Sequence, residues 1–200
     1  MLTVGKDSAG VEGLLCCGRL ACPGCGGRLR GWGHARPRVV RGEDGIGWRL
    51  RPRRARCAGC GRTHVLLPVS VLARRRDAAG VIGAALELAA GGASCAAIAR
   101  LLGRPVGLVR GWVGRLAGRA GQVRAVFTVL VVALDPDPPP IGPAAWPLAD
   151  AVAAITAAAA AFARRFLVAV SPWELAAAVT SGSLLGPVIT AVPGNTKHVL

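Results

Sequence analysis

Apolar side chains recur every three or four residues between positions 78 and 116, which is the period of an amphipathic helix. The pattern is interrupted at glycines and predicts helices over residues 78–90, 95–102 and 106–116. Asp77 and Ser94 stand where the first two helices need an N-cap, and Gly103 supplies the turn before the third. The predicted buried stripes are Val81, Ile82, Ala85, Leu86 and Ala89, then Ile98, Ala99 and Leu102, and then Val109, Trp112, Val113 and Leu116.

Residues 20–68 show a different pattern, in which short runs alternate apolar and basic side chains. Residues 47–51 read Gly-Trp-Arg-Leu-Arg, an alternation typical of a strand with one exposed face. A strand is also predicted from residue 29, and Glu43-Asp44-Gly45 is a turn signal between the two. The first 19 residues have neither period, and we expect them to be irregular.

Beyond residue 120 the chain becomes rich in alanine and proline. Residues 125–134 fit either a helix or one buried strand, and the prolines after them predict a stiff connector. Residues 148–169 predict a long helix, and Ser171-Pro172-Trp173-Glu174 predicts the start of another through a capping box. The pattern as a whole predicts an α+β fold that is mostly α. Its predicted units cover residues 1–19 (irregular), 20–68 (strands), 74–120 (three helices), 121–147 (connector), 148–186 (C-terminal helices) and 187–200 (a loop-like tail).

Four cysteines stand in two matched pairs, Cys22-Pro-Gly-Cys25-Gly and Cys57-Ala-Gly-Cys60-Gly. Each pair can present two thiolates from one turn, and four thiolates complete the tetrahedral shell that a structural Zn²⁺ ion prefers. Glycine after each second cysteine suits a turn with positive φ. The spacing fits a zinc ribbon over residues 20–68, whose pairs cap separate hairpins. We therefore expect one structural Zn²⁺ ion, with Cys22, Cys25, Cys57 and Cys60 as its ligands.

The alternatives to this site are a disulfide-linked module and two chance turn motifs. Seven cysteines are an odd number, and the N-terminal residues lack the apolar run of a signal peptide. Both observations favour a reducing cytoplasm, where such spacings bind metal rather than form disulfides. Cys16 and Cys17 are expected to be spare thiols, and Cys95 a small buried side chain. His34 and His64 are the histidines able to replace a thiolate ligand.

The formal net charge is +15, and it is concentrated in the first part of the chain. Residues 1–124 hold 22 of the 25 lysines and arginines but only 6 of the 10 acidic residues. Such an imbalance favours a polyanionic partner, and the arginine fork suits bidentate phosphate contact. A GC-rich genome would also favour arginine over lysine, but that bias does not explain the missing acidic residues. The arginines expected to contact phosphates are Arg53, Arg54, Arg74, Arg75 and Arg76.

The string from Ala97 to Val113 resembles the DNA-binding helix-turn-helix of bacterial transposases and resolvase-like regulators. Isoleucine and alanine before the turn glycine, and valine and tryptophan after it, carry the resemblance. It implies that the third predicted helix enters the major groove of duplex DNA. The residues expected to face DNA are Arg104, Val106, Gly107, Arg110 and Arg115. Glycines at positions 107, 111 and 114 depart from that family and leave few side chains to read bases. A small helical bundle without DNA contact is the alternative.

Residues 20–120 together resemble a group of uncharacterised actinobacterial proteins with a zinc ribbon and a helix-turn-helix. These are similar to the DNA-binding N-terminal region of insertion-sequence transposases, and the cysteine pairs, the Leu66-Leu67-Pro68 exit and the helices carry the resemblance. It implies a cytoplasmic, nucleoid-associated protein that binds double-stranded DNA as a transcriptional regulator or transposase-like protein. A homodimer contact through the C-terminal helices is compatible with this interpretation.

Other functional classes stay open, namely a catalytically inactive transposase remnant and a zinc-ribbon adaptor for other proteins. A nuclease would need Asp135 to meet further carboxylates on an RNase H-like sheet, but the residues after it predict a proline connector and helices. We therefore do not expect an enzyme, and no small-molecule substrate is evident. Nor do we expect a membrane segment, because the longest apolar run, residues 125–134, is about half the roughly 20 residues needed to span a bilayer.

Overall fold

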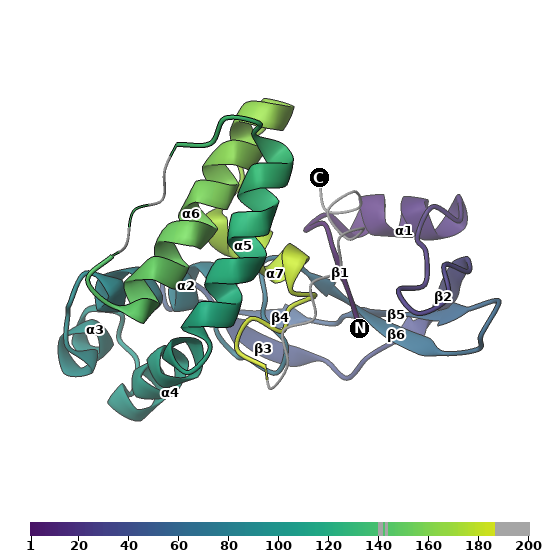
Figure 1. Cartoon of the computed structure of the whole chain (residues 1–200). Helices are drawn as coiled ribbons and strands as arrows, with labels where there is room; N and C mark the ends of the chain where they lie inside the picture. Colours follow the sequence, from purple (N-terminus) through teal and green to yellow (C-terminus); the bar gives the residue numbers. More distant parts are fainter. Residues whose placement is uncertain (140–141, 143, 187–200) are drawn as a thin grey trace.

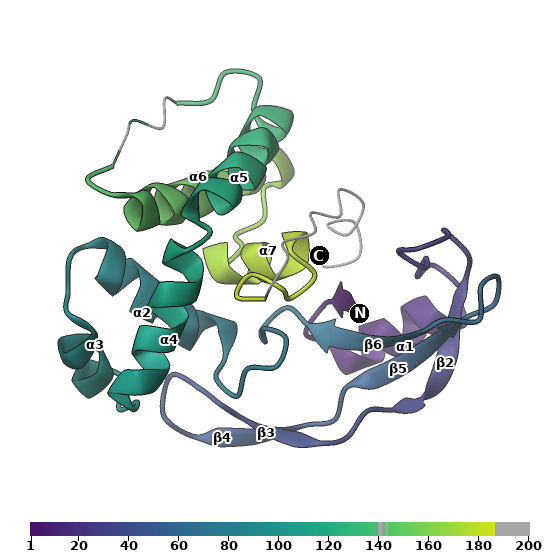
Figure 2. The same cartoon turned by 60° about the horizontal axis from the view of Figure 1, so that its bottom comes forward.

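In the computed structural model, helices and small β-sheets lie side by side (Figure 1, Figure 2), and the structure describes residues 1–139, 142 and 144–186. The predicted α+β class is confirmed for this part of the chain. The strands are β1 (Leu2–Val4), β2 (Leu29–His34), β3 (Arg38–Arg41), β4 (Gly47–Leu50), β5 (Arg53–Cys57) and β6 (Thr63–Pro68). The helices are α1 (Ser8–Cys16), α2 (Ala79–Ala90), α3 (Cys95–Leu101), α4 (Val106–Ala117), α5 (Ala120–Leu134), α6 (Pro147–Phe166) and α7 (Pro172–Val179).

Four strands form one mixed sheet in the order β1-β6-β5-β2, in which β1 is parallel to β6 and the other pairs are antiparallel. The register places Leu29, at the start of β2, opposite Cys57, at the end of β5. Strands β3 and β4 form a separate antiparallel hairpin, with the predicted turn at Glu43-Asp44-Gly45 between them. Gly45 has φ 77°, the left-handed conformation that this turn requires. The sheet therefore brings the segments after Cys25 and before Cys57 side by side.

The first 19 residues are not irregular, contrary to the prediction. Leu2 and Val4 are buried in β1, and their strand pairs with Leu66 and Pro68 of β6. Helix α1 follows because Asp7 caps it, accepting hydrogen bonds from the backbone N–H groups of the next turn. Three residues are too few to show a period of two, and β1 is stabilised by a partner strand distant in the sequence.

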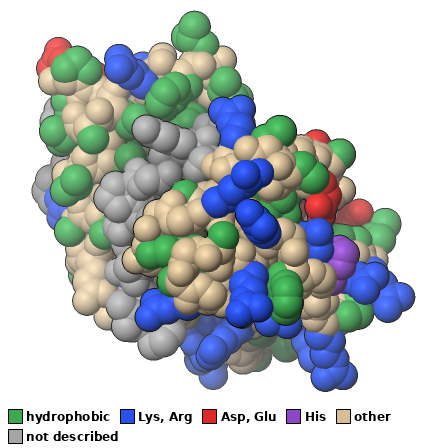
Figure 3. All heavy atoms as spheres, turned by 90° about the vertical axis from the view of Figure 1, so that its right-hand side faces the viewer, with side chains coloured by type: hydrophobic (Ala, Val, Ile, Leu, Met, Phe, Trp, Pro, Cys, Tyr) green, Lys and Arg blue, Asp and Glu red, His purple; other side chains and the backbone are tan. Residues whose placement is uncertain are grey.

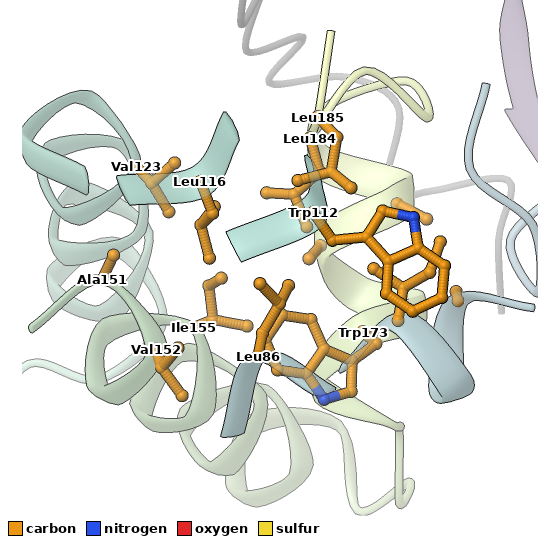
Figure 4. Packing of buried hydrophobic residues seen from close by; sticks show 14 of the residues in the cluster. Leu86, Trp112, Leu116, Val123, Ala151, Val152, Ile155, Trp173, Leu184 and Leu185 are labelled. Carbon is orange, nitrogen blue, oxygen red and sulfur yellow. The ribbon is translucent and has the colours of Figure 1, made fainter. Parts of the chain in front are cut away.

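Helices α2, α3 and α4 lie within a residue or two of their predicted bounds, and the predicted stripes supply their buried side chains. Ser94 caps α3 as expected, with its Oγ accepting from the backbone N–H of Ala97. The cap predicted for α2 is wrong, because the N-cap residue is Ala78 and no side chain caps this end. The Asp77 carboxylate instead accepts a hydrogen bond from Arg104. Figure 4 shows the core that these helices share, with Trp112, Leu86 and Ile155 packed beside Trp173.

Residues 120–134 form helix α5, so the apolar run over residues 125–134 is helical and not a strand. The connector, predicted from residue 121, therefore begins at Asp135. Phe127 and Val131 of α5 are fully or nearly fully buried, and α5 packs along α6. The second predicted C-terminal helix is α7, but Ser171 makes no side-chain capping bond and Glu174 pairs with Lys6. The capping-box prediction is therefore wrong. The predicted tail over 187–200, and connector positions 140, 141 and 143, lie outside the described residues.

Helix α6 is long and apolar enough to cross a membrane, by length and composition alone. Half of its most apolar window is buried within the protein, chiefly against α5, and its buried side chains belong to the shared core. Arg164 and Arg165 lie in its last turn. Core helices of globular proteins pass the same length and composition test.

Candidate metal centre and basic surface

The four cysteines of the matched pairs come together in the structure. The Sγ atoms of Cys22, Cys25, Cys57 and Cys60 all lie within 4.8 Å of one another. The Sγ atoms of Cys22 and Cys60 are 3.8 Å apart, and those of Cys25 and Cys57 are 3.4 Å apart. A tetrahedral ion with metal–sulfur bonds of about 2.3 Å requires sulfur atoms about 3.8 Å apart. The cluster therefore fits one metal ion with four thiolate ligands.

Each cysteine pair lies on its own turn, and the two turns have the same backbone hydrogen bonds. Gly26 and Gly61 follow the second cysteine of each pair, both have φ 71°, and each N–H donates to the carbonyl of the first cysteine. The positive φ predicted at these glycines is thus confirmed. The N–H of Ala58 donates to the carbonyl of Arg28 over 2.9 Å, which joins the two turns.

A further glycine leaves room for the sulfur cluster. A Cβ atom at Gly27 would lie 3.0 Å from Cys57 Sγ and 3.3 Å from Cys25 Sγ, closer than ordinary carbon–sulfur packing. Glycine at this position therefore allows the backbone after the first pair to pass beside the sulfur atoms of the second.

The protein raises the thiol pKa of one cysteine and lowers that of another. A hydrogen bond from the backbone N–H of Cys60 is the main cause that lowers the pKa of Cys57 to about 6. A backbone hydrogen bond from Gly27 lowers the pKa of Cys25, but the side-chain hydrogen bonds with neighbouring cysteines, together with burial, outweigh it and raise the value to about 12. A soft divalent cation that binds these four sulfur atoms displaces the remaining thiol protons, and four thiolates are the donor set that such a cation prefers.

His64 lies beside the cluster rather than within it. Its Nε2 is 3.3 Å from Cys22 Sγ, and its Nδ1 is 3.5 Å from the N-terminal amine of Met1. Burial, with help from the N-terminal charge and Arg62, lowers the pKa of His64 and keeps the imidazole neutral at pH 7. A neutral ring that accepts at Nδ1 donates from Nε2 to the thiolate, which is the usual role of a residue outside the ligand set. The sequence placed His64 near the site but did not indicate this contact.

The remaining predicted cysteines and histidine lie apart from the cluster. Cys16 and Cys17 are exposed, in keeping with spare thiols. Cys95 is only partly buried and packs against the helical core. His34 ends β2 and is exposed.

The basic surface is built around the loop of Arg74, Arg75 and Arg76, which precedes α2. Arg74 and Arg76 are exposed, and Arg74 has φ 59°, a backbone conformation uncommon for a residue with a side chain. Arg75 Nη2 donates to the carbonyl of Leu185 over 2.8 Å, and the N–H of Ala73 donates to the carbonyl of Gly182. The segment after α7 therefore holds this loop in place. On the face in Figure 3, basic side chains are widespread, whereas acidic ones are few and lie at the upper left and at the right.

The outer face of α4 meets this loop. Val106, Gly107, Arg110, Gly114 and Arg115 are exposed, as the predicted helix geometry requires. A cavity of about 660 Å³ lies between α4 and the loop. Its described lining includes Arg74, Arg75, Gly114, Arg115, Gly118 and Arg119.

Arg104, predicted to face DNA, is instead buried. Its Nε donates to Asp77 Oδ1 over 2.7 Å, and its Nη2 donates to the carbonyl of Gly42 over 2.8 Å. Its Nη1 donates to the carbonyl of Leu102 over 3.1 Å. The guanidinium therefore ties the turn before α4 to the loop before α2 and to the β3–β4 hairpin. We correct its assignment from a DNA contact to a structural clamp.

Arg53 and Arg54, predicted to hold phosphates, are both half-buried on β5. Arg53 pairs with Glu12 of α1 and donates from Nη1 to the carbonyl of Gly33 over 2.7 Å. Arg54 Nη2 is 3.4 Å from Thr63 Oγ1. The structure does not bring these two side chains into the cavity between α4 and the Arg74–Arg76 loop. Arg53 lies among other arginines in the sequence, and that pattern did not indicate its ion pair with a carboxylate.

The carboxylates considered for a nuclease site lie in separate ion pairs. Asp135 Oδ2 is 2.7 Å from Arg164, and Asp150 Oδ2 is 3.1 Å from Arg124. Asp135 also ends a helix rather than a strand. Within the described residues, the one group of histidines, cysteines and carboxylates close enough to hold a metal is the cysteine cluster.

Comparison with known proteins gives one match. Residues 22–100 match a sequence model described as a domain of unknown function (DUF6431). The matched segment includes both cysteine pairs, strands β2 to β6, the Arg74–Arg76 loop and α2, and it ends within α3. No curated protein and no solved structure matches the chain. The match thus joins the candidate metal centre and the arginine loop within one recognised sequence unit.

Proposed function

We propose that this protein binds double-stranded DNA, with residues 20–68 acting as a zinc ribbon and α2, α3 and α4 as a helix-turn-helix. One observation carries the proposal. Gly114 and Arg115, on the C-terminal part of the exposed face of α4, line the same cavity as Arg74 and Arg75 of the loop, so a helix able to enter a groove lies beside side chains able to hold phosphate. Duplex DNA has a groove that can take the helix and, beside it, phosphates that can contact the arginines.

The burial pattern of α4 supports this proposal. Val109, Trp112 and Leu116 anchor the inner face of α4 in the core, and Arg110 and Arg115 lie on its outer side. Because α4 exposes few long side chains, we propose that arginine–phosphate contacts supply most of the affinity and that base readout is limited.

The metal has a structural role in this proposal. Four thiolates fill the coordination shell of a tetrahedral Zn²⁺ ion and leave no open position for chemistry. The ion would fix the two turns against each other and thereby hold β2, β5 and β6 in register. Strand β6 leads directly into the arginine loop, so a fixed sheet limits where that loop lies.

The proposal is tested by measuring the affinity of the purified protein for a mixed-sequence duplex by fluorescence anisotropy at several salt concentrations. Affinity should fall steeply between about 50 and 200 mM salt, because several phosphates are neutralised. A variant with Arg110→Ala and Arg115→Ala should bind more weakly and with a smaller salt slope. Arg165→Ala is the control, since Arg165 is exposed in the last turn of α6 and does not line the cavity between α4 and the arginine loop. An affinity independent of salt would refute the proposal.

A protein–protein adaptor and an inactive transposase remnant are the alternatives. The adaptor predicts that Arg74→Ala, Arg75→Ala and Arg76→Ala leave retention on heparin and DNA columns unchanged, whereas DNA binding predicts that the triple change abolishes it. The remnant predicts terminal inverted repeats beside the coding sequence. As a DNA-binding protein, the molecule would act in the cytoplasm at the nucleoid.

We also propose a second copy of the chain as partner. Val129 and Val132 are exposed one turn apart on α5, and Leu167 is exposed just beyond α6. Dimers of helix-turn-helix proteins place two recognition helices on successive half-sites, so a C-terminal contact would serve the proposed function. Sedimentation analysis of Val129→Glu with Val132→Glu tests it, with Ile46→Glu at the exposed hairpin turn as control. A monomeric parent protein would refute this contact.

A further inference from the structure

A second basic cavity lies on the other side of Arg74, between β3 and the arginine loop. Its volume is about 890 Å³. The described residues that line it are Arg36, Pro37, Arg38, Val39, Arg41, Arg74 and Arg76. Five of these seven side chains carry a guanidinium group. Such a density of positive charge in a concave site attracts a polyanion.

One of these arginines has buried donors without acceptors. Nε and Nη2 of Arg38 are buried and have no hydrogen-bond partner in the described part of the chain. Burial also lowers the pKa of Arg38. Arg41 differs, because its Nε lies 3.7 Å from Asp77 Oδ1. A buried guanidinium donor without an acceptor is costly. Because Arg38 also lines the cavity, a turn of its side chain toward a bound anion would give these donors the acceptor oxygens they lack.

The two walls of this cavity are fixed to each other by backbone hydrogen bonds. The N–H of Arg41 donates to the carbonyl of Arg76 over 2.7 Å, and the N–H of Ala78 donates to the carbonyl of Arg41 over 2.9 Å. The Arg104 clamp reaches Gly42, the residue that follows β3. Arg74, with φ 59°, lines both this cavity and the one beside α4. Uncommon backbone conformations of this kind persist where the surrounding structure fixes them, often at binding sites.

We propose that this cavity binds phosphodiester groups of the DNA backbone through Arg36, Arg38, Arg74 and Arg76, outside the groove that α4 contacts. The proposal rests on the proposed DNA-binding function and adds a partner surface to it. Because Arg74 borders both cavities, the backbone of one duplex would pass from the α4 side to the β3 side of the loop. The hairpin β3–β4 thus becomes part of the DNA interface, although the sequence indicated no contact from it.

The experiment compares a variant with Arg36→Ala and Arg38→Met against Arg165→Ala and the parent protein. Duplex affinity is measured by anisotropy between about 50 and 200 mM salt. Each lost phosphate contact should lower the slope of log K against log salt by about 1, so the double variant should lose a slope of about 1 to 2. Arg165→Ala should keep the parent slope. Methionine at position 38 retains the apolar stem and removes the orphaned donors, and the urea midpoint should therefore stay equal or rise.

Three outcomes separate this proposal from the proposed function. A double variant that matches Arg165→Ala in slope, while the parent binds DNA, would overturn the cavity proposal alone. A parent protein that binds no duplex would overturn both proposals. In that case calorimetry with inorganic pyrophosphate shows whether the cavity has another ligand: binding that Arg38→Met abolishes would reassign it to a free phosphate compound. A lower slope with an unchanged urea midpoint supports the proposal.

Discussion

At the scale of single residues, Arg104 shows how an arginine in a basic protein can act inside the structure. Its side chain is buried, and its carboxylate partner Asp77 is buried with it. Removing one member of such a pair leaves an uncompensated buried charge, which typically costs about 3–5 kcal/mol. We expect Arg104→Ala to lower the free energy of unfolding by about that amount, as measured by urea denaturation.

Arg100→Ala is the matched control for this change. Arg100 is exposed on α3, and surface changes of this kind usually alter stability by about 0.5 kcal/mol or less. If Arg104→Ala unfolds at the parent urea concentration but binds DNA weakly, the clamp assignment is wrong and the original DNA-contact prediction is restored. No short-range pattern indicates the clamp, because Asp77 and Gly42 lie 27 and 62 positions from Arg104.

At the scale of elements, glycines in α2 and α4 have different surroundings, so a change to alanine should affect stability in opposite directions. The sequences of the two helices do not reveal this difference. A Cβ at Gly107 or Gly114 of α4 would meet no atom within 4 Å, whereas a Cβ at Gly83 of α2 would overlap the Trp173 ring. We expect Gly107→Ala and Gly114→Ala each to stabilise the protein by about 1 kcal/mol through helix propensity. Gly83→Ala should destabilise it by about 1–3 kcal/mol through overpacking.

Thermal unfolding followed by circular dichroism measures these three changes. A lower melting temperature for Gly107→Ala would contradict the open surroundings of α4. If α4 lies close against DNA as proposed, the same alanines should weaken duplex binding while they stabilise the free protein. If α4 did not contact DNA, the alanine variants at Gly107 and Gly114 should become more stable without losing affinity for the duplex.

The α5–α6 pair contains a pH-dependent contact. Hydrogen bonds from the Arg164 guanidinium are the main cause that lowers the pKa of Asp135, and the N–H of Asp137 adds to the effect. A lowered folded-state pKa means that this contact stabilises the protein above the ordinary carboxyl pKa of 3.8 and that the stabilisation is lost as pH falls through the lowered value. We expect Asp135→Asn to melt below the parent at pH 6 and the two melting temperatures to converge as the pH falls below the lowered pKa. A constant difference across that range would contradict the assignment.

The elements also show which predictions a sequence supports. The stripes of α2, α3 and α4 are long enough for a helical period to appear, and their predicted bounds are close to the observed ones. The cysteine turns were equally clear because ligands and glycines recur in both. Strand β1 and the wrongly predicted cap at Asp77 depend on distant partners, namely Leu66 for Leu2 and Arg104 for Asp77. Short-range patterns contain no information about those contacts.

At the scale of the whole molecule, the hydrophobic residues divide into separate clusters. The largest contains the helical residues from Leu72 to Leu185, including α2 to α7. A second contains sheet and α1 residues, and Cys22 and Cys57 belong to it. A small third cluster of Val40, Leu67 and Val71 lies between the hairpin and the segment after β6. The sequence predicted the division into strands and helices. It did not indicate that the segment between β6 and α2, which contains the arginine loop, lies beside α4.

This division predicts how the molecule responds to removal of a metal ion bound by the four cysteines. The sheet beside the cysteine cluster has few buried apolar residues, and metal binding to such small units supplies much of their folding free energy. A strong chelator should therefore unfold β2, β5 and β6 while the helical core, which has its own large cluster, stays folded. Metal analysis should give one equivalent for the parent and for Cys16→Ser, and none for Cys57→Ser.

Circular dichroism and fluorescence distinguish the two parts. Trp32 is exposed on β2 with the Arg56 guanidinium 5.0 Å from its ring centre, so its emission reports on the sheet, whereas Trp112 and Trp173 are buried in the helical core. With chelator, helical ellipticity should persist and duplex affinity should fall, because the sheet no longer holds β6 and the arginine loop beside α4. A protein that binds no metal and keeps both its sheet signal and its affinity in chelator would show that the four thiols are only neighbours. The zinc-ribbon interpretation would then be wrong, and the arrangement of the basic surface would need another cause.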